Sequence, residues 1–551
     1  MRKPILIIII LLTGTCVSYA QQTRQALSKT AQNGALYDAQ ITDDGSLSID
    51  YGCMMKKEQA FVNYKFDSKL KLIKEEESTE PKIKEIDKPM LKYEYIYTTV
   101  GGCSSFDVLS MDLNVSKISV TKTWNNKKQY YDTDFKELKI SSGKDGKFKY
   151  KGYVGYYDAV SGSNLLLVKE NDKSKEDAAQ YKLITISLNS EVTEIPIGEL
   201  GKYTLVFSSL IKKNPEVADV YDEKNLAEYN ALFLFAPFKT CSADPKDFIM
   251  LITDGAGKEI SKSTIKMPLT ASTIIEMQQV GNELYFFGLT SAGTGSHYRY
   301  EFMDFSNIPN PCYPDFYNYR DNQREMDVAK CEVSNLILMK IKGDKLEYLT
   351  TTPASALQSK KVVPPSVKKV PKSEFSRFSI QAFDVLDNGD MVVAGQRKVI
   401  INMGGTSKWA YEEVTCFHFD KNGNLRAEYC IEPQLATAKQ DKIFPMTQVF
   451  IVSGDKSSVY WIMYEPEGIS GYANFWAAYN GRKTIYAAYQ PEVTKINLET
   501  AKIGDPELPL GKEFLVYAKC PLIMKANSSE GIFMGQDRKG DFLGLTLFDF
   551  R

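Results

Sequence analysis

Short strand-like runs separated by glycine turns recur along most of this chain, and this repeat constrains the fold more than any other feature. It is clearest between Ser379 and Ile431, where four runs are separated by turns that include DNG (387–389) and KNG (421–423). Asn-Gly and Asp-Gly pairs supply the positive φ that tight hairpins need. In each copy the second run is apolar, and the third alternates before an Asp or Asn.

Seven clear copies follow this order, and a weaker one lies between Tyr93 and Trp124. A four-stranded unit needs neighbours to cover both of its faces, and ring closure supplies them. The pattern therefore predicts an all-β fold, a single closed β-propeller of four-stranded blades. Eight blades are favoured and seven are the alternative, depending on the weaker copy. The last copy lacks an outer strand, which residues 23–30 are expected to supply.

The first 20 residues have the pattern of a secretory signal. Arg2 and Lys3 precede an apolar run from Ile5 to Leu12, and small residues stand at Ser18 and Ala20. We expect a signal peptide over 1–20, a propeller domain over 21–551, and no transmembrane segment in the mature chain. The predicted location is periplasmic or outer-membrane-associated, with secretion less favoured. Lipidation of Cys16 stays open.

Long inserts interrupt the repeat at about 296–331, 359–372 and 465–489. The second, with five lysines and three prolines, is predicted to be an extended exposed linker. The charged stretch 74–88 is predicted to be a solvated loop.

Eight cysteines remain after Cys16, and an even number in an exported chain indicates disulfides. The best candidates are Cys416 with Cys430, which flank a hairpin turn, and Cys312 with Cys331, which would close the base of the first insert. Eight buried free thiols are the alternative.

Two inserts are rich in aromatic residues, which are frequent at binding hot spots. Loops of this length usually carry a function. A loop packed on itself is the alternative for the first insert. The candidate binding residues are Tyr298, Tyr300, Tyr313, Phe316, Tyr317 and Tyr319 in the first insert, and Tyr472, Phe475 and Trp476 in the third.

Catalytic patterns are scarce. The chain has two histidines, of which His297 lies in a turn and His418 in a strand where a packed role is expected. No GxSxG motif occurs, so we assign no catalytic residues. Asp420, Asn422 and Asn424 fit a hairpin turn better than a calcium loop, and no metal or cofactor is expected. With 68 basic and 69 acidic side chains, the chain offers no bulk attraction to nucleic acid.

The phrases FHFDKNGNL (417–425) and DVLDNGDMVVAGQ (384–396) resemble those of exported β-propeller proteins of Bacteroidota-type bacteria. That resemblance implies a propeller in the cell envelope and an accessory part in an outer-membrane or secretion complex. We therefore predict a non-enzymatic binding or scaffold protein that presents propeller loops to a protein partner, with a glycan as another ligand. The alternative is a glycan- or peptide-acting hydrolase or lyase with its site at the channel.

Overall fold

A computed structural model describes residues 21–551 apart from a set of segments, most of them between strands. The segments outside the description are 55–57, 82–88, 102–111, 126, 128–129, 141–149, 159, 171–180, 199, 201–202, 216–225, 238–245, 268–271, 292–332, 369, 372–377, 404–405, 433–444, 468–486, 518–521 and 526–527.

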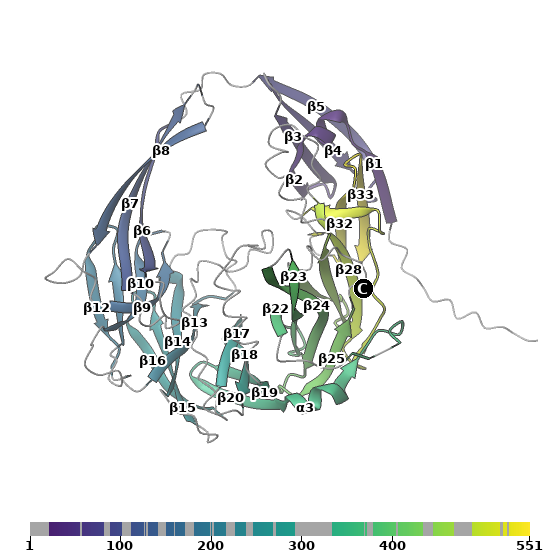
Figure 1. The fold of residues 1–551 in the computed structure, drawn as a ribbon. Coiled ribbons are helices and arrows are strands. Elements are labelled where there is room, and N and C mark those ends of the chain that lie inside the picture. Colours follow the sequence, from purple (N-terminus) through teal and green to yellow (C-terminus); the bar gives the residue numbers. More distant parts are fainter. Residues whose placement is uncertain are drawn as a thin grey trace, which may run out of the picture.

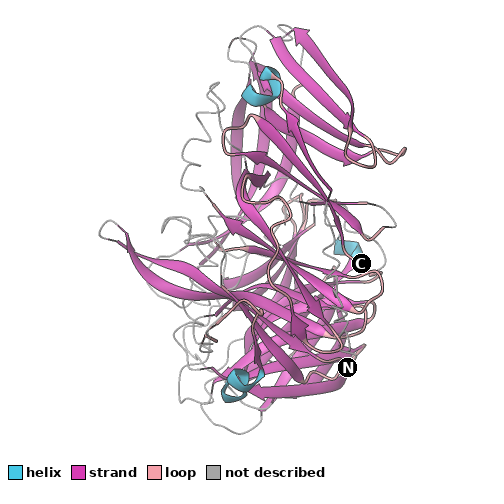
Figure 2. Ribbon diagram, turned by 90° about the vertical axis from the view of Figure 1, so that its right-hand side faces the viewer, coloured by secondary structure: helices cyan, strands magenta, loops and turns pink. Residues whose placement is uncertain are grey.

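The described chain is nearly all β, and its strands form consecutive antiparallel units arranged around an arc (Figures 1 and 2). This arrangement is propeller-like, as predicted. In chain order the first four units are β2 (Ala35–Ile41) to β5 (Leu72–Pro81), with β3 (Leu47–Met54) and β4 (Glu58–Phe66); β6 (Leu91–Gly101), β7 (Asp112–Asn125) and β8 (Tyr130–Ile140); β9 (Tyr150–Tyr157), β10 (Asn164–Glu170), β11 (Tyr181–Ile186) and β12 (Val192–Pro196); and β13 (Tyr203–Lys212), β14 (Tyr229–Pro237), β15 (Lys246–Asp254) and β16 (Glu259–Met267).

The remaining units follow the same order. They are β17 (Ser272–Val280), β18 (Glu283–Ser291), β19 (Val333–Lys342) and β20 (Lys345–Pro353); β22 (Phe378–Val385), β23 (Met391–Met403), β24 (Thr406–Phe419) and β25 (Leu425–Ile431), with β21 (Lys361–Val362) at the edge; β26 (Thr447–Val452), β27 (Ser458–Pro466), β28 (Ala487–Asn497) and β29 (Lys502–Ile503); and β30 (Phe514–Tyr517), β31 (Leu522–Met524), β32 (Glu530–Asp537) and β33 (Phe542–Asp549), with β1 (Gln21–Ala26). The helical segments are α1 (Lys29–Asn33), α3 (Ala354–Leu357) and the short turns Leu226–Glu228 and Gln358–Lys360.

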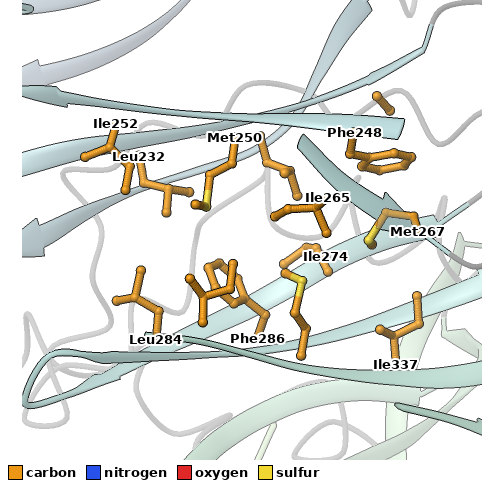
Figure 3. Packing of buried hydrophobic residues seen from close by; sticks show 14 of the residues in the cluster. Leu232, Phe248, Met250, Ile252, Ile265, Met267, Ile274, Leu284, Phe286 and Ile337 are labelled. Carbon is orange, nitrogen blue, oxygen red and sulfur yellow. The ribbon is translucent and has the colours of Figure 1, made fainter. Parts of the chain in front are cut away.

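The second strand of most units is buried on both faces. In β14, Leu232, Leu234 and Ala236 pack toward the β17–β20 unit (Figure 3). Their neighbours Phe233 and Phe235 pack toward the β9–β12 unit. Successive residues of a strand point to opposite faces, so one apolar run supplies two interfaces.

Seven hydrophobic clusters of described residues join eight units in this way. They occupy the junctions between successive units from β6–β8 through β30–β33, and the junction between β30–β33 and β2–β5. Among the described residues no such cluster joins β2–β5 to β6–β8, which lie at the open end of the arc in Figure 1. The closed ring and the number of blades therefore stay predictions. We call the two facing units the open junction.

The outer strand of the last unit comes from the other end of the chain, as predicted. β1 pairs antiparallel with β33, from Gln21 opposite Leu547 to Ala26 opposite Phe542. The Arg24 guanidinium carbon lies 3.9 Å from the centre of the Phe542 ring, a cation–π contact that adds to the backbone pairing. The strand covers 21–26, and the expected segment 23–30 continues into α1.

Two loop predictions were wrong. Leu72–Pro81 forms the outer strand β5 rather than a solvated loop, because its backbone pairs with β4 while its charged side chains stay exposed. The segment after Gln358 is not a free linker: β21 pairs parallel with β25. There the buried Lys361 ammonium lies 3.4 Å from the Glu428 carboxylate.

A buried polar network holds the β22–β25 unit to its neighbour. His418 is fully buried, with Nε2 2.9 Å from Asp390 Oδ2 and Nδ1 3.1 Å from the Tyr429 hydroxyl. Arg426 contacts the same Asp390 oxygen at 3.2 Å and donates to the carbonyl of Leu498 in the next unit at 2.6 Å. The expectation of a packed role for His418 is confirmed.

Replacing Asp390 by Ala should destabilise the fold by about 3 kcal/mol, because buried partners lose their acceptor. Burial alone would raise the pKa of Asp390, but the His418 hydrogen bond and the nearby charges lower it. Its contribution is therefore present above the unfolded pKa and is lost as the pH falls. Denaturant unfolding at pH 7 measures the cost. Asp387→Ala, in the same turn and in an exposed ion pair with Lys456, should cost less than about 1 kcal/mol. Equal losses in both variants would contradict a structural role for the network.

Candidate functional site

The connections between strands are distributed unequally over the two ends of the units. In an antiparallel meander, the turns after the first and third strands lie at one end and the connection after the second strand at the other. Described turns at the first end are short, such as Leu386 to Asp390 and Asp420 to Asn424. At the other end, 41 residues separate β18 from β19 and 20 separate β27 from β28. Loops that carry function would gather at this second end.

The first strands of four units, β13, β17, β22 and β26, are edge strands on the inner side of the arc (Figure 1). Neighbouring inner strands contact one another from unit to unit. The side chains of these strands are therefore the described groups closest to the predicted channel.

Glutamine amides connect these inner strands. Gln279 of β17 accepts from the Lys212 amide at 2.8 Å and donates to the Lys212 carbonyl at 2.9 Å. Gln278 accepts from the Val385 amide of β22 at 2.5 Å. Because blade-to-blade contacts at the inner edge cannot use ordinary sheet pairing, these side chains replace the missing backbone partners.

A third glutamine pair continues the connection to β26. Gln448 donates to Gln381 at 3.0 Å, and the Trp461 indole donates to Gln448 at 3.0 Å. The four inner strands are thus joined in series by amide hydrogen bonds.

Three of these inner strands also carry a β-bulge near the same level. The register shifts occur between Leu205 and Phe207, between Ile274 and Glu276, and between Ile380 and Ala382. A bulge turns a strand locally and re-aims its side chains, and bulges are frequent beside active sites.

Asp384 stands out among the acids of these strands. Burial raises the pKa of its carboxyl above the ordinary value, and a hydrogen bond with Gln278 offsets part of that effect. It is the one described carboxyl group with a clearly raised pKa. Partial exposure leaves it accessible from the inner side of the arc. Glu276 on β17 is the other acidic residue in β13, β17, β22 and β26.

Acids and an arginine also meet at a bulge on β23 and β24. Arg397 lies 2.5 Å from a Glu412 carboxylate oxygen and 2.7 Å from one of Glu413. These residues belong to the second and third strands of their unit rather than to the inner strand. The arrangement is a partly exposed ion-pair network at the loop-rich end.

The aromatic candidates predicted from the inserts fall outside the described residues, so their role stays a prediction. This holds for Tyr298, Tyr300, Tyr313, Phe316, Tyr317, Tyr319, Tyr472, Phe475 and Trp476, and for His297, Cys312 and Cys331.

The predicted disulfide between Cys416 and Cys430 is wrong, since both cysteines are free. The pairing register places Cys416 opposite Tyr429 and Cys430 opposite Thr415. The two cysteines are therefore offset by one residue, and their side chains point to opposite faces of the sheet. Burial raises the pKa of the Cys416 thiol well above its ordinary value.

The sequence analysis missed the inner-strand residues Gln278, Gln279, Gln381, Asp384 and Gln448. Polar residues in the first run of successive copies, as in EMQQV (276–280) and IQAFD (380–384), were the available signal.

Within the described ranges, no group of three His, Cys, Asp or Glu side chains has the arrangement of a metal site. No helix there is long and apolar enough to cross a membrane.

Comparisons with known proteins give structural likeness at low scores. No family model matches the chain. No curated protein matches it. Solved structures that resemble it include a lignostilbene dioxygenase of Pseudomonas brassicacearum, with 10% identity over 83% of this chain and 86% of that one and a TM-score of 0.28. The polysaccharide lyase Uly1 shares 10% identity over 84% and 89%, with a TM-score of 0.29. An α-L-arabinofuranosidase, Arb93A, of Fusarium graminearum shares 8% over 73% and 93%, with a TM-score of 0.25.

The prediction of a non-enzymatic binding or scaffold protein is contradicted by this comparison, because these neighbours are enzymes. The hydrolase or lyase alternative is the better supported of the two. At such identities and scores, no activity, substrate or residue role passes from these structures to this chain.

Replacing Asp384 by Asn should change stability in a pH-dependent way. The folded wild-type chain holds the Asp384 proton to a higher pH than the unfolded chain does. Its free energy of unfolding therefore falls as the pH rises from about 4 through the folded pKa. The variant has no such proton to lose, so its stability relative to wild type should increase over the same range. Urea unfolding at pH 4, 6 and 8 measures the difference, and a pH-independent difference would show that Asp384 ionises normally.

Proposed function

We propose that this chain is a hydrolase or lyase acting on a glycan or a peptide, with its reacting groups on the inner strands. The observation that carries the proposal is Asp384: a partly accessible carboxyl group on an inner strand, with a pKa that burial raises. Such a group keeps its proton closer to neutral pH than an ordinary aspartic acid, as a general acid requires.

In the proposed hydrolysis, Asp384 donates its proton to the leaving-group atom as the scissile bond breaks. Glu276 takes a proton from the water whose oxygen forms the new bond. Gln278 is a positioning residue, because it holds the Val385 amide and the Asp384 carboxyl through its own amide. Two carboxyl groups on facing elements are the usual requirement for glycoside hydrolysis.

The arc is proposed to form a ring of eight units, with β6–β8 as the eighth. Its support is that β6–β8 packs on β9–β12 through its own hydrophobic cluster, as the other units do on their neighbours. It has three strands rather than four.

Export to the cell envelope, of the kind found in Bacteroidota-type bacteria, is also proposed. Its support is the signal-like pattern of the first 20 residues, together with β1, which begins at Gln21 directly after the expected cleavage position.

The test is an activity screen on the exported chain. Polysaccharides and casein are incubated with wild type, and reducing ends, unsaturated sugars and new amines are measured. Asp384→Asn should lower the rate by a factor of about 100 or more. Activity of the wild type should also decline as the pH rises through the Asp384 pKa. Asp387→Asn, in the adjacent exposed turn, serves as the control and should keep its rate.

Full activity in a folded Asp384→Asn variant would place the chemistry elsewhere. Absence of activity toward every substrate of the screen would refute the proposed function.

A further inference from the structure

The first unit differs from the others in its second strand. In β14, β18 and β27 the second strand is apolar on both faces. In β3 it alternates, with Leu47, Ile49 and Tyr51 packed in a core cluster and with Ser48, Asp50 and Gly52 on the other face. Such alternation is typical of a sheet with one face in contact with water or a polar ligand. This face is therefore not built as another hydrophobic blade interface.

The polar face of β2–β5 carries both hydrogen-bonding groups and an aromatic pair. Asn63 donates to Ser48 and to Asp50, each at 2.7 Å. Tyr37 is 66% exposed and meets Phe61 edge to face, with ring centres 6.4 Å apart. The amide, hydroxyl and carboxylate groups thus lie on the same face as an accessible ring.

The other side of the open junction is rich in tyrosine. Cross-strand pairing places Tyr93, Val120 and Phe135 in one row of β6–β8, on the face opposite to Ile96 and the core cluster. Tyr93 stacks on Tyr95 with ring centres 6.2 Å apart, and the Lys122 ammonium lies 5.5 Å from the Tyr93 ring centre.

These rings remain exposed: Tyr93 by 43%, Tyr97 by 51% and Phe135 by 64%. Each free face is turned away from the neighbour on which its unit packs. Both therefore face the opening of the arc in Figure 1.

We infer that the open junction is a binding site for a neutral polysaccharide. A sugar ring has an apolar face of C–H groups, which fits an exposed aromatic ring, and a rim of hydroxyls, which fits Asn, Asp and Ser side chains. Charges balance across the junction. On β2–β5, Asp38, Asp50 and Glu76 oppose Lys65 and Lys74, and on the tyrosine face Lys122 and Lys139 oppose Glu137. A neutral glycan fits this balance better than a polyanion.

This inference rests on the proposed function for its relevance, because it selects a glycan over a peptide as the substrate. It does not depend on the chemistry of Asp384. Binding at the open junction would hold a long chain beside the inner strands and leave the reacting bond to the site there.

The test measures binding without turnover. The full chain carrying Asp384→Asn is run through native gels containing laminarin, soluble mannan or alginate, and the affinity is measured by calorimetry for each glycan that retards it. We expect retardation by laminarin or mannan and none by alginate. Tyr37→Ala, and separately Tyr93→Ala with Tyr97→Ala, should each weaken binding about tenfold or more, equivalent to about 1.4 kcal/mol.

Leu138→Ala is the matched control. Leu138 is 60% exposed on β8 but belongs to the face opposite to Phe135, so its removal should leave affinity unchanged. Circular dichroism verifies that each variant is folded.

Failure of both neutral glycans to bind, binding of alginate alone, or equal affinity in folded tyrosine variants would each overturn the inference. Retained glycan binding together with full activity of Asp384→Asn would refute only the proposed chemistry. Cleavage of peptides with no glycan binding would refute only the open-junction site.

Discussion

A strand that is apolar on both faces needs a neighbour on each side, and this requirement organises the molecule. β14 and β27 each contribute alternate residues to two different clusters, so neither of their units is complete alone. Burial of large side chains such as Phe233, Phe286 and Trp461 supplies the main stabilising free energy, at about 25 cal/mol for each Å² of apolar surface removed from water. The turns, the β1 pairing and the glutamine bridges then fix how the packed units are aligned.

Much of this organisation could be predicted from the sequence because its signals are local. The DNG and KNG turns are found with Gly389 and Gly423 at φ +84° and +81°, and the apolar runs are found as second strands. The pairing of the N-terminal segment with the last unit was also predictable, since one copy of the repeat lacked its outer strand. Period and turn chemistry are properties of a few adjacent residues, and they need no knowledge of the rest of the fold.

The candidate site was much less predictable, because its properties depend on residues far apart in the sequence. Gln278 reaches the amide of Val385 across 107 positions, and Asp384 differs from other acids only through the burial around it. The cysteine prediction failed for a related reason. Flanking a hairpin turn brings two strands together, but only the register, offset here by one residue, decides whether Cys416 and Cys430 share a face. The strand β8 was missed because its exposed, charged residues lack the apolar pattern of a repeat strand.

The pairing of β1 with β33 has a consequence for the order in which the chain folds. The partners are more than 500 positions apart, as Gln21 opposite Leu547 shows. During synthesis β1 emerges first, and its partner is among the last segments to be made, so β1 must remain without its sheet for almost the whole of translation. Closing so long a loop costs entropy before any contact repays it. The last unit is therefore expected to complete its sheet in a late, slow step, and until then the edge of β33 is open to pairing with other chains.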